Sequence, residues 1–327
     1  MVCQTNCSNI GTYVTTIQAA IDAAESGDSV VVLPGTYAEN LTLGVNAADQ
    51  IDITLKSRDG AGSVTVTGSG ADDPVIHIAG GNSSLVQGLT FSNAKKSNAF
   101  STRGIYIDEA SPVIQESIIE DNHLSYSRYG AGVYVNSGSP VFKRIWVRGN
   151  YAAAGAGIYC RDGSLQLINS IVSGNGIAGK AVRGGGLYVL NAIDPIRHCS
   201  ATIINSTFSG NRAQQGGAIQ GTGSVTVKYS IFWGNLDEGY SSEDQMPAGY
   251  DVTYSVVESG YSGVGNEMND PKFVMPMPAS SAPTSSGNYQ LQGYTYTPNA
   301  VLDLQLQGGD VLDPLTPSED YYSDPRP

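Results

Sequence analysis

A phrase of the form Gly-apolar-Tyr-apolar recurs along the middle of the chain and constrains its fold more than any other feature. It reads GIYI at Gly104, GVYV at Gly132, GIYC at Gly157 and GLYV at Gly186, and a related GAIQ begins at Gly217. The intervals of 28, 25, 29 and 31 residues vary too much for a rigid helical repeat. Stacked coils tolerate such variation, because extra residues can bulge at turns while the strands stay in register.

Two further phrases accompany each copy and complete a coil of three strands. One ends in Asn, as in SIIEDN, IWVRGN, SIVSGN, STFSGN and SIFWGN, and the other follows a Ser, as in SPVI, SPVF, SLQL and SVTV. Three short strands separated by Gly, Ser and Asn turns predict an all-β fold, a right-handed parallel β-helix of about nine coils over residues 29–274. The segment 1–28 is expected to hold a short capping helix, because Ile17, Ala20, Ile21 and Ala24 recur at helical spacing. Residues 275–327 form a tail rich in Pro, Ser and Tyr that lies along the coils or covers their open end.

Strand alternation assigns side chains to the inside or the outside of the coils. Two inward columns are expected, Ile105, Val133, Ile158, Leu187 and Ala218 in one and Ile107, Val135, Cys160 and Val189 in the other. The residues between them are expected to point outward: His77, Tyr106, Tyr134, Tyr159, Tyr188 and Ile219. The Asn that ends each second phrase occupies one turn position, where stacked amides can hydrogen-bond from coil to coil.

The charge composition limits the kinds of macromolecule that the chain is expected to bind. The 327 residues include 30 acidic and 17 basic side chains, giving a net charge of −13. Nucleic acid is therefore an unfavourable partner, and an anionic polysaccharide would need a bound cation or a local basic patch. Charged residues make up only 14% of the chain, which is typical of an extracellular or cell-surface β-rich protein.

The cysteines and the start of the chain bear on location. Cys3 and Cys7 predict a local disulfide in preference to half a metal site, and Cys160 is expected to be a small buried hydrophobe. The pairing of Cys199 is left open. No stretch approaches the roughly 18 apolar residues of a membrane span, so the chain is not expected to be transmembrane. Its start has no basic region followed by an apolar one, as expected of a mature chain or an excised segment without its export signal.

Two parts of the chain resemble known families. Residues 15–43 resemble the N-terminal cap and first coil of the pectin-lyase-like superfamily, and GGAI with FSGN resembles the repeats of chlamydial polymorphic outer-membrane proteins and related bacterial β-helix surface proteins. The first resemblance implies a β-helix, and the second implies a surface protein. Pectin methylesterases share the PGTY opening and a GLTFSN-like phrase, but the catalytic phrases of that family have no counterpart here.

Charged residues concentrate between residues 108 and 162, where a site for acid–base chemistry could be sought. Glycosidases need paired carboxylates, and lyases need a base beside a neutralised carboxylate. The candidate catalytic residues are Asp108, Glu116, Glu120, Lys143, Arg144 and Arg161. Counted back from the Asn column, Glu116 and Arg144 share one position on adjacent coils, as do Glu120 and Arg148, so ordinary cross-strand ion pairs explain most of this charge.

The outward aromatic column is the candidate binding feature, formed by His77, Tyr106, Tyr134, Tyr159 and Tyr188. Such a column can stack sugar rings, contact another molecule, lie beneath the tail or stabilise the coils. No cofactor or metal is expected. Calcium is left open, because Asp72-Asp73, Asp237-Glu238 and Glu243-Asp244 supply oxygen atoms at a spacing that specifies nothing.

These observations favour a non-catalytic extracellular surface protein, adhesin-like or a subunit that self-associates or meets neighbouring subunits through its tail or Tyr column. The alternative is a lyase or glycoside hydrolase acting on an acidic polysaccharide.

Overall fold

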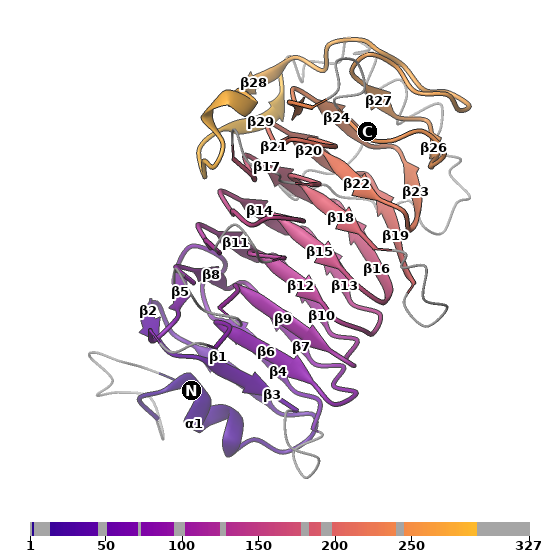
Figure 1. Ribbon diagram of the computed structural model, residues 1–327. Helices are drawn as coiled ribbons and strands as arrows, with labels where there is room; N and C mark the ends of the chain where they lie inside the picture. Colours follow the sequence, from indigo (N-terminus) through magenta and orange to yellow (C-terminus); the bar gives the residue numbers. More distant parts are fainter. Residues whose placement is uncertain are drawn as a thin grey trace.

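The chain coils into a solenoid of three parallel sheets, which we term A, B and C (Figure 1). The computed structural model describes residues 2, 14–44, 51–70, 73–94, 102–124, 129–177, 183–190, 198–239 and 245–292. Within a complete coil the strands follow the order A, B, C, and each sheet pairs the strands of successive coils in parallel. The predicted three-strand coil is thus confirmed.

Sheets A and B have nine strands each, and sheet C has seven within the described residues. Sheet A contains β1 Ser29–Val32, β4 Thr54–Ser57, β7 Leu85–Gln87, β10 Val113–Gln115, β13 Val141–Lys143, β16 Gly163–Ile168, β19 Cys199–Ile204, β23 Ser224–Lys228 and β26 Asp251–Thr253. Sheet B contains β2 Gly35–Ala38, β5 Val64–Thr67, β8 Thr90–Ser92, β11 Ile118–Glu120, β14 Trp146–Arg148, β17 Ile171–Ser173, β20 Thr207–Ser209, β24 Ile231–Trp233 and β27 Val256–Val257. Sheet C contains β3 Leu41–Leu43, β6 Ile76–Ala79, β9 Ile105–Asp108, β12 Val133–Val135, β15 Ile158–Cys160, β18 Leu187–Val189 and β22 Ile219–Gly221.

The inside of the solenoid is one continuous apolar core that follows from strand alternation. Sheet B shows the rule clearly, because its inward column is fully buried: Phe91, Ile119, Val147, Val172, Phe208 and Phe232. One register prediction is wrong. Leu187 pairs with Ile219 and Tyr188 with Gln220, so Ile219 points inward and Gln220 continues the outward column.

A buried ladder of asparagines runs along the corner between sheets B and C, as predicted. Each Nδ2 donates to the next Oδ1 at 2.8–3.0 Å, and each Oδ1 also accepts the backbone N–H of the preceding rung. The rungs are Asn122, Asn150, Asn175, Asn211 and Asn235. Gln245 ends the ladder by accepting from Asn235 at 2.6 Å. These amides satisfy backbone groups that the tight corner would otherwise leave unpaired.

The glycine of the Gly-apolar-Tyr-apolar phrase is explained by this ladder. A Cβ on Gly132 would lie 2.5 Å from the carbonyl oxygen of Gly157 and 3.0 Å from the Asn150 amide. A Cβ on Gly157 would meet the Gly186 carbonyl at 2.6 Å and the Asn175 amide at 3.2 Å. Only glycine lets successive coils and the ladder approach this closely.

The corner between sheets A and B is held by a column of serines. The backbone N–H of Ser170 donates to Ser206 Oγ, that of Ser206 to Ser230 Oγ, and that of Ser230 to Ser255 Oγ, at 3.1–3.2 Å. The residue before each serine bends the chain at positive φ, between 50° and 54°: Glu116, Asn169, Asn205, Tyr229 and Tyr254. Arg144, at φ 50°, occupies the same position before Ile145.

A disulfide joins Cys160, at the end of β15, to Cys199, at the start of β19, with 5.9 Å between their Cα atoms. Both cysteines are buried. The expectation that Cys160 acts only as a small buried hydrophobe is therefore wrong. Cys160 does point inward, but the next coil brings Cys199 to it. Cys3 and Cys7 lie outside the described residues.

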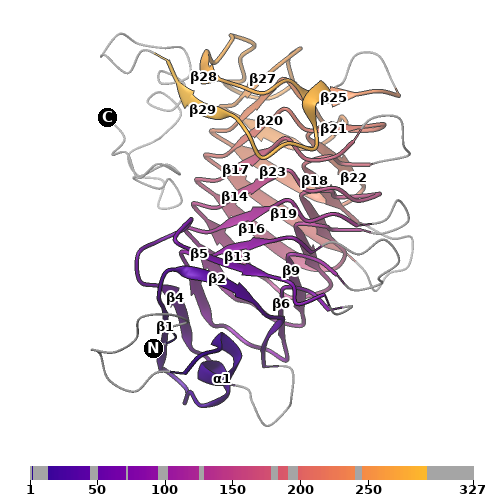
Figure 2. The ribbon, with the colours of Figure 1, turned by 90° about the vertical axis from the view of Figure 1, so that its left-hand side faces the viewer.

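Helix α1 (Ile17–Asp22) covers the N-terminal end of the stack and confirms the predicted cap (Figure 2). Thr16 Oγ1 accepts from the Ala19 N–H, and the Glu39 carboxylate accepts from the N–H groups of Ile17 and Gln18 at 2.9 and 3.0 Å. Buried Ile17 and Ile21 close the core at that end.

The first part of the tail lies along the outside of sheet B. Strand β28 (Phe273–Met275) pairs antiparallel with β29 (Asn288–Leu291), and the one-turn η1 (Ala279–Ser281) lies between them. Thr284 N–H donates to the Gly174 carbonyl at 2.9 Å. A Cβ on Gly174 would lie 2.3 Å from Thr284 O. Glycine at this position, next to the ladder residue Asn175, therefore leaves space for the tail. The remaining two-strand pair, β21 (Arg212–Ala213) with β25 (Leu236–Asp237), extends the corner between sheets B and C.

Candidate functional site

The six charged candidate residues do not meet in one site, because the solenoid distributes them over three faces. Asp108 and Arg161 lie on sheet C, where their positions correspond to that of Asn136 on the intervening coil. Lys143 lies on sheet A, with Glu116 and Arg144 at the corner between sheets A and B. Glu120 lies on sheet B. Their catalytic role remains a prediction, and any site must be sought on one face at a time.

The aromatic column runs along the outside of sheet C in register, as the repeat predicts. His77 pairs with Tyr106, Tyr106 with Tyr134, Tyr134 with Tyr159, and Tyr159 with Tyr188. Ring centroids are 4.7–5.6 Å apart along the column. The rings are tilted by 35° and 53° at the His77 end and nearly parallel, at 17° and 3°, at the Tyr188 end.

Because the tyrosines stack on one another, the faces of the central rings are occupied. Tyr159 is sandwiched between Tyr134 and Tyr188, Tyr129 also stacks on it at 5.1 Å and 12°, and only 6% of it is exposed. Burial, reinforced by the neighbouring phenols, raises the pKa of Tyr159 well above its ordinary value. The Arg103 guanidinium lies 4.5 Å from the ring centroid of Tyr134. The column therefore presents ring edges and hydroxyls outward more than open faces.

A polar row accompanies the aromatic column two residues further along each strand. Asn136 Nδ2 donates to Asp108 Oδ1 at 2.6 Å, and Arg161 Nη1 donates to Asn136 Oδ1 at 2.5 Å. Asn136 thus bridges the carboxylate and the guanidinium. Sequence reasoning missed Asn136, although it stands two residues after Tyr134 and alternation places both on the same face.

His77 ends the column without acting as an exposed acid or base. Burial lowers its pKa, although the negative charges of Asp108 and Asp73 oppose that shift. Its Nε2 atom is buried and has no hydrogen-bond partner among the described residues. The imidazole is therefore neutral near pH 7 and serves as the last ring of the stack.

The corner charges form the cross-strand pair that the sequence predicts. Arg144 Nη2 lies 2.5 Å from Glu116 Oε1, and Gln87 Nε2 donates to Glu116 Oε2 at 2.6 Å. Burial raises the pKa of Glu116, but the hydrogen bonds from Arg144 and Gln87 outweigh it and hold that pKa below its ordinary value. An ionised carboxylate with both oxygens engaged is poorly suited to proton transfer.

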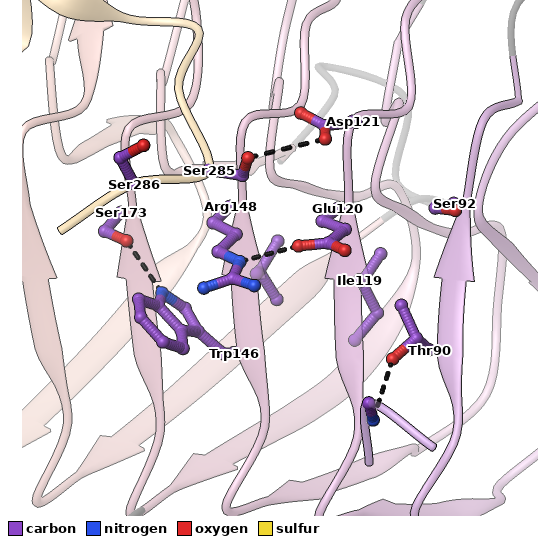
Figure 3. A network of polar contacts seen from close by, with 12 residues as sticks. Thr90, Ser92, Ile119, Glu120, Asp121, Trp146, Arg148, Ser173, Ser285 and Ser286 are labelled. Atoms are coloured by element: carbon purple, nitrogen blue, oxygen red, sulfur yellow. Dashed lines mark hydrogen bonds and ion pairs between the residues drawn. The ribbon is translucent and has the colours of Figure 1, made fainter. Parts of the chain in front are cut away.

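The second predicted pair lies on sheet B beside the tail (Figure 3). Arg148 Nε donates to Glu120 Oε2 at 2.7 Å, and its guanidinium lies 4.0 Å from the Trp146 ring centroid. Trp146 Nε1 donates to Ser173 Oγ at 2.8 Å, and Trp146 packs edge-on against Tyr289 of β29. This network anchors the tail to the coils.

Metal ligands are not assembled in the part of the chain that the structure describes, since no group of three or more His, Cys, Asp or Glu side chains lies close enough to hold an ion. Asp237 accepts from the backbone N–H groups of Gly216 and Gly239, and Glu238 pairs with Arg212. Asp72, Glu243 and Asp244, which belong to the other candidate calcium clusters, lie outside the described residues.

No described helix is long and apolar enough to cross a membrane.

Comparison with known proteins supports the fold. No protein-family model matches the chain, and no curated protein matches it. Among solved structures, YbhC of Escherichia coli superposes with a TM-score of 0.50 at 12% identity, covering 81% of this chain and 84% of that one. Pectin methylesterase PemA from Erwinia chrysanthemi gives 0.46 at 15% identity, covering 97% and 98%. A pectin methylesterase variant bound to a hexasaccharide also gives 0.46 at 15%, covering 82% and 90%.

Together with the sheet topology, the likeness to YbhC places the chain in the pectin-lyase-like parallel β-helix fold. At 12% identity the likeness concerns the fold alone.

Proposed function

We propose that the protein is an extracellular, non-catalytic β-helix that works as a binding surface, in the manner of an adhesin module. The observation that carries the proposal is the distribution of its charged residues. Glu116 and Glu120 each contact an arginine of the next coil, and Asp108 accepts a hydrogen bond from Asn136. Each carboxylate thus has a local structural partner, whereas catalysis by paired carboxylates needs two that face one reacting bond.

Two further features support this proposal. The Cys160–Cys199 disulfide suits an oxidising compartment such as the cell exterior. The stacked tyrosines, disulfide and two ladders of side-chain hydrogen bonds make a rigid rod, and a rigid face costs little conformational entropy when it binds a long ligand. Self-association through the tail or the Tyr column remains a separate proposal.

The competing function is a polysaccharide-active enzyme, and one observation favours it. On sheet C, Asp108, Asn136 and Arg161 form a continuous polar row beside Tyr106 and Tyr134. A carboxylate and a guanidinium on one face can bind the hydroxyls and the carboxylate of a charged sugar. If the protein is an enzyme, this row is its site.

Turnover assays separate the two functions. The full chain is incubated with methyl-esterified and free polygalacturonate, alginate and hyaluronan, and the readouts are methanol release, unsaturated-product absorbance and reducing ends. We expect no turnover above that of heat-denatured protein. Turnover that disappears in Asp108→Asn and persists in Glu120→Gln would refute the proposal and assign the reaction to sheet C.

A further inference from the structure

The outward face of sheet A carries a column of long polar side chains that the features described so far leave unused. The strand registers place Lys56, Gln87, Gln115 and Lys143 on four successive coils, in β4, β7, β10 and β13. All four are partly exposed. At about 4.8 Å per parallel strand, the two lysines stand about 14 Å apart along the solenoid axis.

The charge of this face is opposite to that of the whole protein. The chain has 30 acidic and 17 basic residues, yet the strands of sheet A hold three lysines and a single carboxylate, that of Asp251 in the last strand. Next to the column, Glu116 is neutralised by Arg144. Lys56 and Lys143 have no ion-pair partner among the described residues. Screening over roughly 8 Å at physiological ionic strength lets such a local patch act despite the net charge of −13.

An apolar column lies beside the polar one. Leu85, Val113 and Val141 are in register on β7, β10 and β13, two residues before Gln87, Gln115 and Lys143 respectively, and are partly exposed. Over these coils the face therefore offers aliphatic side chains next to amides and ammonium groups. A pyranose has the matching chemistry, because its C–H groups are apolar and its rim carries hydroxyls.

We propose that the outward face of sheet A, from β4 to β13, binds a linear anionic polysaccharide that runs along the solenoid axis. Carboxylate or sulfate groups of the glycan contact Lys56 and Lys143, and its hydroxyls contact Gln115 and the free amide oxygen of Gln87. The sugar C–H groups lie on the column that includes Val113 and Val141. This inference rests on the proposed function as a binding surface and names its partner.

A regular glycan suits this face better than a nucleic acid. Each coil adds one hydrogen-bonding side chain to the column. A polymer that advances by one sugar per coil can therefore repeat the same contact along the solenoid axis. A phosphate backbone needs a dense array of cations to bind, and only two unpaired lysines stand in the column.

The test measures binding of the full chain to immobilised polygalacturonate and alginate, with dextran as the neutral glycan and polyphosphate as the non-glycan polyanion. We expect retention on the acidic glycans that weakens as salt is raised, and little retention on dextran or polyphosphate. Lys56→Gln and Lys143→Gln should each weaken binding about two- to fivefold, as expected for exposed charge contacts. Lys272→Gln is the matched control, because it removes the same charge from an exposed residue outside sheet A and should bind as wild type does.

Several outcomes overturn the inference. These are the absence of retention on either acidic glycan, equal retention on dextran or polyphosphate, and wild-type binding by both sheet A variants. Loss of binding in Arg161→Gln with the lysine variants unaffected would place the glycan on sheet C and contradict the inference, while leaving the proposed function intact. Unchanged circular dichroism and unfolding midpoints in the variants separate lost binding from lost folding.

Discussion

Replacing Asn175 by alanine tests the internal ladder at its centre. The Asn175 side chain is fully buried and makes four hydrogen bonds: its Oδ1 accepts from the N and Nδ2 atoms of Asn150, and its Nδ2 donates to Val147 O and Asn211 Oδ1, all at 2.9–3.0 Å. Asn175→Ala leaves the Asn150 backbone N–H buried without that acceptor, which costs about 1–3 kcal/mol, and removes three more bonds of about 1 kcal/mol each. We expect a loss of about 4–6 kcal/mol in the free energy of unfolding.

Urea denaturation followed by circular dichroism measures this loss as a lower midpoint at unchanged slope. Asn136→Ala is the matched control, because the same substitution removes two hydrogen bonds from a partly exposed side chain and should cost about 1 kcal/mol. If Asn175→Ala lost no more stability than Asn136→Ala, the ladder would not be a major stabiliser and the reasoning would fail.

Three further predictions concern packing, covalent structure and pH. Gly157→Ala should destabilise by about 1–3 kcal/mol, because its Cβ would lie 2.6 Å from a carbonyl oxygen, whereas Gly68→Ala, with 3.8 Å to its nearest neighbour, should be nearly neutral in the same unfolding assay. Cys160→Ser removes a bridge across 39 residues of sequence and should cost about 3–4 kcal/mol, and a reductant should lower wild-type stability but leave the variant unchanged. Because the folded pKa of Glu116 is depressed, its stabilisation is full above the unfolded pKa near 4.3 and disappears as pH falls through the folded value. The stability difference between wild type and Glu116→Gln should therefore shrink below about pH 4, and a difference independent of pH would contradict the assigned pair.

The fold was readable from the sequence because its signals repeat. The Asn that ends each second phrase, the Gly before each Tyr and the cross-coil pairs of Glu116 and Glu120 all recur at matching positions. The serine ladder was not predicted, although SIVSGN, STFSGN and SIFWGN begin with the serines that form it. The ladder forms because the residue before each serine turns the chain at positive φ, and no single phrase of the sequence indicates that conformation.

Other features depend on contacts between coils that the repeat does not encode. The glycine of the GAIQ copy indicates a register that is one residue too early, because Ile219 points inward and Gln220 outward. The partner of Cys160 is in another sheet on the next coil, so strand alternation alone does not reveal it. The sequence did not indicate the polar column of sheet A, because Gln87 and Gln115 are uncharged and belong to no recognisable motif. Only the strand pairing places them between Lys56 and Lys143.

A non-catalytic role in binding acidic glycans is tested most directly by measuring turnover and binding on the same glycan samples. Wild-type protein and Lys143→Gln are incubated with polygalacturonate and alginate, and each sample is assayed for bound protein and for new reducing or unsaturated ends. We expect salt-sensitive binding that weakens in the variant, with no new ends in either sample. New ends that accumulate with wild-type protein and vanish in Asp108→Asn would contradict the non-catalytic role.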